Sequence, residues 1–137
     1  MILAALNGSD TDGDVVNTAC QISIGSKTRM ALVFVIEIPR KYPIDIELAK
    51  MTSKAEETLD QMEKLCRKMK VKPNTVIVQA RSMGTAIVAH SREQAVDIIV
   101  MGIDKIVTNN SHVMSNDVSY VLENANCKVI TCKSPVP

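Results

Sequence analysis

Short apolar runs that alternate with helix-like segments constrain the fold of this chain more than any other feature. The runs are Ile2–Leu6, Met30–Glu37, Thr75–Gln79, Asp97–Met101 and Lys128–Thr131. Continuous apolar runs of this length, bounded by turn-forming residues, are typical of strands that are buried on both faces of a parallel sheet. Because segments with helical features separate the runs, we expect the order β-α-β-α-β-α-β-α-β and a parallel sheet with helices on both faces. No linker or repeat divides residues 1–137, so the pattern predicts one α/β domain.

The intervening segments predict four helices. We expect them from Asp12 or Asp14 to a C-terminal Gly25, and over Asp45–Lys70, Gly84–Ala95 and Asp117–Asn124. The longest segment carries one apolar stripe at steps of three or four residues, which indicates an amphipathic helix. That stripe consists of Leu48, Met51, Ala55, Leu59, Met62, Cys66 and Met69. The polar stretch of residues 104–116 has no clear period, so we expect a loop there.

Composition excludes several classes of function. The net charge of +1 creates no field that would attract nucleic acid, and the aromatic residues Phe34, Tyr42 and Tyr120 are too few for a base-stacking surface. The longest apolar stretches, such as 30–36, are too short to span a membrane. The first residues lack a basic segment and turn polar by Asn7, unlike a signal peptide. We therefore expect a cytoplasmic protein that binds neither nucleic acid nor membranes.

The cysteines and histidines do not form a metal-binding pattern. Cys20, Cys66, Cys127 and Cys132 contain no Cys-x-x-Cys pair, and His90 and His112 have no ligand-like spacing to any of them. We expect four reduced, mostly buried thiols and no metal site.

Four segments together resemble the universal stress protein family. The turn Asn7-Gly8-Ser9 follows the first strand where the family has a V-D-G-S type turn, and the second strand ends in 34–37 (FVIE), similar to the family's HVIE. Residues 97–102 (DIIVMG) and 120–131 (YVLENANCKVIT) are similar to two further family blocks at the expected distance. The similarity covers the whole chain in the right order.

The resemblance implies the adenine nucleotide alpha hydrolase-like fold, an open five-stranded parallel sheet of order 3-2-1-4-5. In that order the chain direction reverses between the first and fourth strands, and ligands bind at such a point, outside the carboxyl ends of the strands. The implied pocket lies between residues 7–9 and 102–116. The nucleotide-site residues that the resemblance implies are Asn7, Gly8, Ser9, Val35, Gly102, Lys105, Ser115 and Asn116.

The family's phosphate-binding loop is modified in this chain. Nucleotide-binding members have Gly-x2-Gly-x9-Gly-Ser/Thr after the fourth strand, and this spacing places Lys105, Ser115 and Asn116 at the second glycine, third glycine and Ser/Thr positions after Gly102. One interpretation is that these side chains replace backbone amides as donors to ATP or AMP, with Mg²⁺. The other is that Ser115 and Asn116 only cap the last helix and that their β-carbons obstruct the phosphates.

The acidic segment before the first helix has a second interpretation. Residues 10–14 (DTDGD) resemble the DxDGT motif of haloacid dehalogenase-type phosphatases, in which one Asp attacks phosphorus. That chemistry needs the nucleophile at the end of the strand, whereas Asn7-Gly8-Ser9 intervene here. Carboxylates at a helix start, where they complement the macrodipole, are the simpler interpretation.

These observations lead to two hypotheses about function. The first is a non-enzymatic, homodimeric stress-response or regulatory protein without tight ATP binding. The resemblance implies that it dimerises through the exposed edge of the last strand, at Val129, Ile130 and Thr131, and its protein partners are not specified by the sequence. The alternative is an ATP- or AMP-binding switch or slow ATP hydrolase that uses the modified loop.

Overall fold

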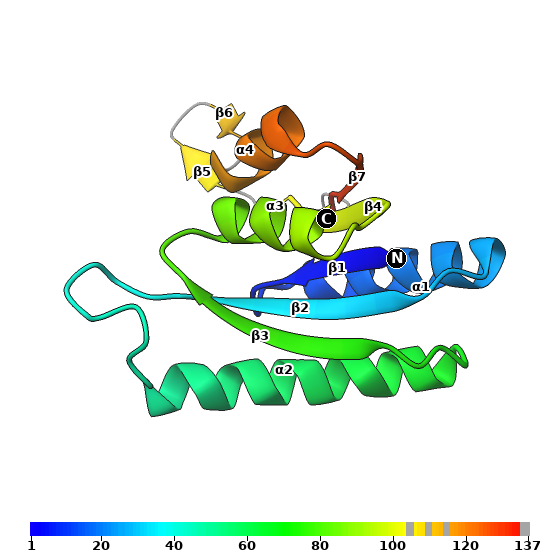
Figure 1. Cartoon of the computed structure of the whole chain (residues 1–137), viewed down its shortest axis with the longest axis horizontal. Helices are drawn as coiled ribbons and strands as arrows, with labels where there is room; N and C mark the ends of the chain where they lie inside the picture. The colour runs from blue at the N-terminus through cyan, green and yellow to red at the C-terminus, as the bar shows by residue number, and fades with distance from the viewer. Residues whose placement is uncertain (104–105, 109–110, 114–115, 135–137) are drawn as a thin grey trace.

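The computed structural model describes residues 1–103, 106–108, 111–113 and 116–134, and Figure 1 shows their arrangement. The main sheet contains β1 (Ile2–Leu6), β2 (Met30–Glu37), β3 (Asn74–Ala80), β4 (Ile98–Gly102) and β7 (Lys128–Cys132). The helices are α1 (Asp12–Ser26), α2 (Ala49–Lys68), α3 (Met83–Glu93) and α4 (Asn116–Asn124). A separate antiparallel pair, β5 (Ile106–Thr108) and β6 (Ser111–Val113), stands apart from this sheet.

The main sheet is parallel and has the strand order β3-β2-β1-β4-β7. In terms of its five strands this is the order 3-2-1-4-5, so the predicted α/β fold and topology are confirmed. The sheet's centre is β1, where Ile2 pairs with both Met30 and Ile98. The edges are β3 and β7, each of which has one neighbouring strand.

Two hydrophobic clusters cover the two faces of the sheet. Along β1, alternate side chains enter opposite clusters: Ile2, Ala4 and Leu6 join one, while Leu3 and Ala5 join the other. The first cluster includes α1 and α2, and the second includes α3 and α4. Figure 1 shows α2 on one side of the sheet and α3 with α4 on the other. Every β1 residue is buried, which explains why the run contains no polar residue.

Three details differ from the sequence-based expectations. The polar stretch contains the hairpin β5–β6 rather than only a loop. The helix α1 passes Gly25 and ends at Ser26, where Lys27 takes the left-handed conformation with φ of 53°. The helix α2 begins at Ala49 rather than Asp45, because turns that join Pro39 to Tyr42 and Pro43 to Ile46 precede it.

Side chains from the end of β3 hold this connection between β2 and α2. The Gln79 side-chain amide donates to the carbonyls of Ile44 and Ile46 at 2.8 and 2.9 Å. The Arg81 guanidinium donates to the carbonyls of Ile38, Pro39 and Tyr42. Arg81, although exposed, is therefore a donor that orders the backbone of this connection.

The four thiols are free, as expected, but only half of them are buried. Cys20 and Cys66 are buried, whereas Cys127 and Cys132 are half-buried. None of the helices in the described ranges is long and apolar enough to cross a membrane.

Candidate functional site

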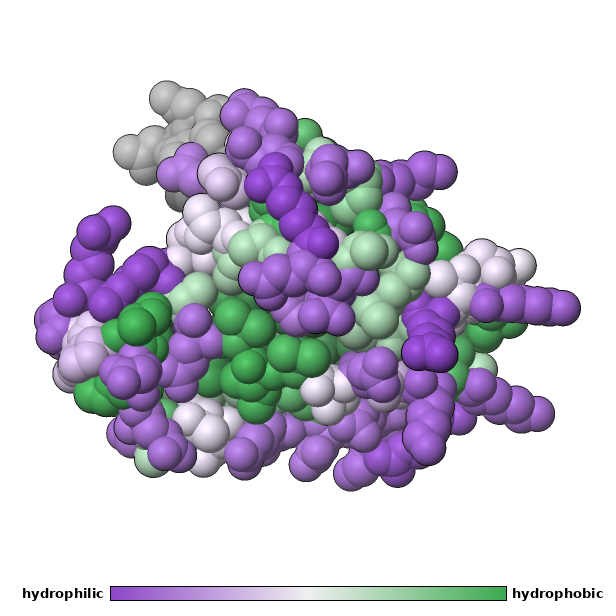
Figure 2. Space-filling view, viewed as in Figure 1, coloured by the Kyte–Doolittle hydropathy of each residue, from purple (hydrophilic) through white to green (hydrophobic). Residues whose placement is uncertain are grey.

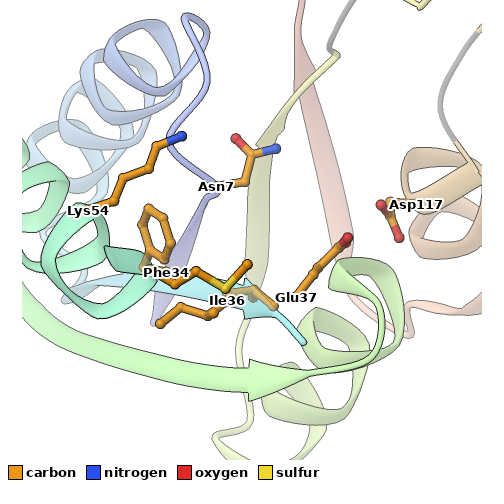
Figure 3. A pocket seen from close by; sticks show the side chains of 8 residues that line it. Asn7, Phe34, Ile36, Glu37, Lys54 and Asp117 are labelled. Carbon is orange, nitrogen blue, oxygen red and sulfur yellow. The ribbon is translucent and has the colours of Figure 1, made fainter. Parts of the chain in front are cut away.

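A pocket of about 350 Å³ opens at the carboxyl ends of β1 and β2. Its lining comes from the end of the sheet, from α2 and from the start of α4. Figure 3 shows the pocket, which is lined by Asn7, Phe34, Val35, Ile36, Glu37, Met51, Lys54 and Asp117. The pocket lies outside the carboxyl ends of the strands, where ligands bind in open α/β sheets, but its described lining comes from β1 and β2 rather than from β1 and β4, between which the chain direction reverses. Relative to the sequence-based expectation, the described lining extends towards β2 and α2.

The carboxylate of Asp12 binds the backbone amides of the turn that follows β1. Gly8 has φ of +83°, a left-handed conformation that favours glycine. The turn directs the backbone amides of Asn7 and Gly8 towards the Asp12 carboxylate. Asp12 accepts hydrogen bonds from the Asn7 amide at 3.3 Å and the Gly8 amide at 2.8 Å. Only 4% of Asp12 is exposed. Asp12 therefore anchors the start of α1 and occupies amides that could otherwise face an anion, which agrees with the helix-start interpretation of this acidic segment.

The absence of a side chain at Gly8 leaves room for Lys54. A β-carbon at Gly8 would lie 2.6 Å from Lys54 Cε and 3.5 Å from Phe34 Cζ. Figure 3 shows the Lys54 ammonium directed towards Asn7, above the ring of Phe34. The turn thus brings one cationic group to the rim of the pocket.

Two carboxylates bind the first amides of α3 beside the pocket. Glu37 Oε1 accepts from the Met83 amide at 2.9 Å, and Asp117 Oδ1 accepts from the Gly84 amide at 2.9 Å. These amides belong to the positive end of the helix macrodipole, where an anion is favoured. Carboxylates from β2 and α4 therefore occupy a second position that a ligand's phosphate could use.

The structure brings together some of the predicted site residues and separates others. Asn7 and Val35 line the pocket, and Gly8 and Ser9 form the adjoining turn, in which the Ser9 amide donates to Asn7 Oδ1 at 3.1 Å. Asn116 is exposed at the first position of α4. Lys105 and Ser115 lie outside the described residues.

Gly102 has a packing role that the sequence did not reveal. It ends β4, and a β-carbon there would lie 2.7 Å from Thr11 Cβ and 3.4 Å from Val15 Cγ2. The strand end and the start of α1 therefore approach each other so closely that only glycine fits.

The sequence analysis did not predict Glu37, Lys54 and Asp117 as site residues. The local sequence could have indicated Glu37, because it is the single charged residue at the end of an apolar strand. Lys54 and Asp117 had none, since each is one of several charged residues on a helix. Only the packing of α2 and α4 beside the sheet brings these two side chains to the pocket.

The comparisons with solved structures return the same fold. A universal stress protein from Archaeoglobus fulgidus superimposes with a TM-score of 0.78 at 20% identity, covering 95% of this chain and 96% of that one. A structure from Archaeoglobus fulgidus in complex with dAMP has a TM-score of 0.75 at 19% identity and covers 95% and 94% of the two chains. A universal stress protein in complex with cAMP has a TM-score of 0.71 at 17% identity, covering 98% and 96%.

A comparison with curated protein sequences returns no significant match. The model of the universal stress protein family matches residues 1–133, which is nearly the whole chain. The sheet order, the pocket at the strand ends and the segments quoted above agree with that match. This chain belongs to the universal stress protein family.

Proposed function

We propose that this protein is a non-enzymatic regulatory member of its family that acts in the cytoplasm as a homodimer and does not bind ATP tightly. The observation that carries the proposal is the occupation of backbone amides around the pocket by the chain's own carboxylates. Asp12 holds the amides of Asn7 and Gly8, while Glu37 and Asp117 hold the first amides of α3. A triphosphate would have to displace these groups or lie against their charges, and either costs binding free energy.

The pocket's chemistry suits a small ligand with few negative charges. Its volume of about 350 Å³ is at the lower end of the range for small-molecule sites. Phe34, Val35, Ile36 and Met51 supply apolar contacts, and Lys54 supplies one positive charge. Among the described residues that line it, Lys54 is the one cationic side chain that would offset a triphosphate.

An adenine-nucleotide switch, or a slow ATP hydrolase that uses Mg²⁺ and the modified loop, is the second candidate. It is supported by the place of the pocket, by Lys54 at its rim, and by similar structures that hold dAMP and cAMP. In this candidate Lys54 and Asn116 would face the phosphate.

Calorimetric titration of the nucleotide-stripped protein with AMP and with ATP, each in the presence of Mg²⁺, separates the two candidates. We expect no tight binding of ATP by the wild type and no phosphate release above the protein-free rate. The double variant Glu37→Gln/Asp117→Asn keeps hydrogen-bond acceptors but removes two negative charges, so it should bind ATP more tightly. Glu93→Gln/Glu123→Gln removes two negative charges at exposed positions outside the pocket lining, so it is the matched control and should leave binding unchanged.

Micromolar binding of ATP by the wild type would contradict the proposal. If that binding were lost in Lys54→Met or Asn116→Ala, the switch would become the leading candidate. Phosphate release that depends on either residue would favour the hydrolase.

A further inference from the structure

The outer edge of β3 is a surface of the sheet that the proposed function does not use. The strand pairs with β2 on one side, and none of the strands in the described ranges lies on the other. Its centre, 76–78, is apolar, and Ile77 is 39% exposed. Figure 2 shows hydrophobic side chains gathered where β3 runs in Figure 1, with hydrophilic side chains below them. An exposed edge with an apolar centre is a template for pairing with another strand.

A groove runs along this edge between β3 and α2. Its first part is a cavity of about 350 Å³ that Thr75, Val76 and Ile77 form together with α2 residues. Leu59 is the buried apolar residue on the helix side. A second cavity of about 470 Å³ shares Glu63 with the first and continues to Pro73. The two cavities therefore lie end to end along this edge and adjoin at Glu63, and together they are called the groove below.

The charges along the groove are segregated. Glu56, Asp60 and Glu63 line the first cavity, and their spacing of four and three residues places them in one row on α2. The second cavity, beside the start of β3, carries Arg67, Lys70 and Lys72. Glu63 stands at the boundary and pairs with Arg67 at 3.6 Å. The groove is thus acidic beside the apolar part of β3 and basic at its end.

We propose that this groove binds an extended, basic peptide segment of a protein partner, which adds to the sheet beside β3. The partner's backbone pairs with the outer edge of β3, and its apolar side chains extend the face of the sheet that carries Val76 and Val78. On the opposite face, the aliphatic stems of its basic side chains cover Ile77. Its Lys or Arg side chains lie against Glu56 and Asp60, while a carboxylate at its end lies near Arg67, Lys70 and Lys72. Strand addition of this kind gives affinity through the main chain and specificity through alternate side chains.

The same charges argue against a second copy of this chain at this edge. An antiparallel pairing of two β3 strands would place two α2 helices on the same face of the joined sheet. The rows of Glu56, Asp60 and Glu63 would then face each other, and like charges repel. The acidic row therefore selects a basic partner and suppresses self-association.

The test uses short fluorescent peptides in which Lys and Val alternate and which end in a free carboxylate. We expect the Lys peptide to bind roughly tenfold more tightly than the same peptide with Glu in place of Lys, as measured by anisotropy at low salt. A version with Pro at the central Val positions should lose binding, because Pro cannot donate to a ladder. Amidation of the peptide's end should weaken binding.

Charge reversal on α2 is the second arm of the test. The double variant Glu56→Lys/Asp60→Lys should invert the preference between the Lys and Glu peptides. The control Glu47→Lys/Glu57→Lys makes the same change in net charge at exposed positions outside the groove lining, and should keep the original preference.

Three results would overturn the proposal. They are equal binding of the Lys and Glu peptides, equal binding of the Pro peptide, and an unchanged preference in Glu56→Lys/Asp60→Lys. A concentration-dependent mass that Ile77→Asp abolishes would instead assign this edge to a second copy of the chain.

Discussion

Gly102 shows at the scale of one residue how the site's framework depends on close packing. The Gly102→Ala substitution should lower the free energy of unfolding by about 1–3 kcal/mol, because its β-carbon would press on the largely buried Thr11. Urea denaturation measures this change. The matched control is Gly25→Ala in α1, where a β-carbon meets nothing within 4 Å and the better helix former should stabilise the protein. Equal effects of the two substitutions would contradict this role for Gly102.

The contact between Cys20 and Cys66 makes a prediction about alkaline pH. Their sulfur atoms are 3.5 Å apart, and both residues are fully buried where α1 and α2 cover the sheet. Burial, together with the hydrogen bond and charge of Cys20, raises the pKa of the Cys66 thiol from 9.0 to about 12. The unfolded chain therefore releases this proton at lower pH than the folded protein does. The contribution of this thiol to the free energy of unfolding should be fully present below about pH 9 and should be lost as the pH rises towards 12.

Urea denaturation of the wild type and of Cys66→Ala at several pH values tests this prediction. The variant should be less stable at pH 7, because it creates a cavity, but it should lose less stability above pH 9. The difference in slope cannot exceed about 1.4 kcal/mol per pH unit, the value for one proton. Parallel pH profiles of the two proteins would show that Cys66 does not titrate in this way.

At the scale of the elements, the connection between β2 and α2 depends on Arg81. Its guanidinium donates to the carbonyls of Ile38, Pro39 and Tyr42, which orders a segment that precedes two pocket-lining residues of α2. Arg81→Met should therefore increase the rate of tryptic cleavage after the exposed Arg40 and Lys41, which mass spectrometry of the fragments measures. Loss of donors to these carbonyls, of which those of Pro39 and Tyr42 are exposed, should cost about 1 kcal/mol of stability.

Arg92→Met is the matched control for this prediction. Arg92 also donates to a backbone carbonyl, that of Asn124, but at the end of α4. The Arg92→Met variant should therefore leave the rate of cleavage after Arg40 and Lys41 unchanged. If both variants accelerate that cleavage equally, general destabilisation rather than local loosening would explain the result.

The elements also show which parts of the fold the sequence could predict. The apolar runs and the stripe on α2 identified the strands and the longest helix, because burial on both faces or on one face leaves a local pattern. The predicted start of α2 was wrong by four residues, because long-range hydrogen bonds from the side chains of Gln79 and Arg81 stabilise turns there instead of a helix. The hairpin β5–β6 was missed because its short strands carry no alternation that distinguishes them from a loop.

The candidate site was less predictable than the fold for a related reason. Asn7 follows the first apolar run and Val35 lies within the second, and the family resemblance indicated both. Lys54 and Asp117 reach the pocket only through helix packing. The carboxylates that occupy the amides of α3 come from 46 and 33 residues away, and no local pattern encodes such pairs.

At the scale of the whole molecule, the two edges of the sheet have different expected partners. The edge β3 lies beside the acidic row of α2, which opposes self-pairing. The edge β7 carries Val129, Ile130 and Thr131, all half-buried, and the described helices that contact it, α1 and α4, carry no row of three acidic residues. An apolar edge of this kind is a liability that pairing with a second copy removes. We therefore expect the homodimer to form at β7 and leave β3 for another protein.

Substitution of one residue on each edge tests this division. The wild type should have about twice the monomer mass of 15.0 kDa by light scattering. Ile130→Asp should give the monomer mass, because an aspartate at the centre of β7 cannot be buried against its copy without a large desolvation cost. Ile77→Asp, the same change on the opposite edge, should remain dimeric. Circular dichroism must show that both variants stay folded, because Ile130 also packs against the core. A folded Ile130→Asp that keeps the dimer mass would exclude β7 as the interface, and dissociation by Ile77→Asp would place the interface at β3 instead.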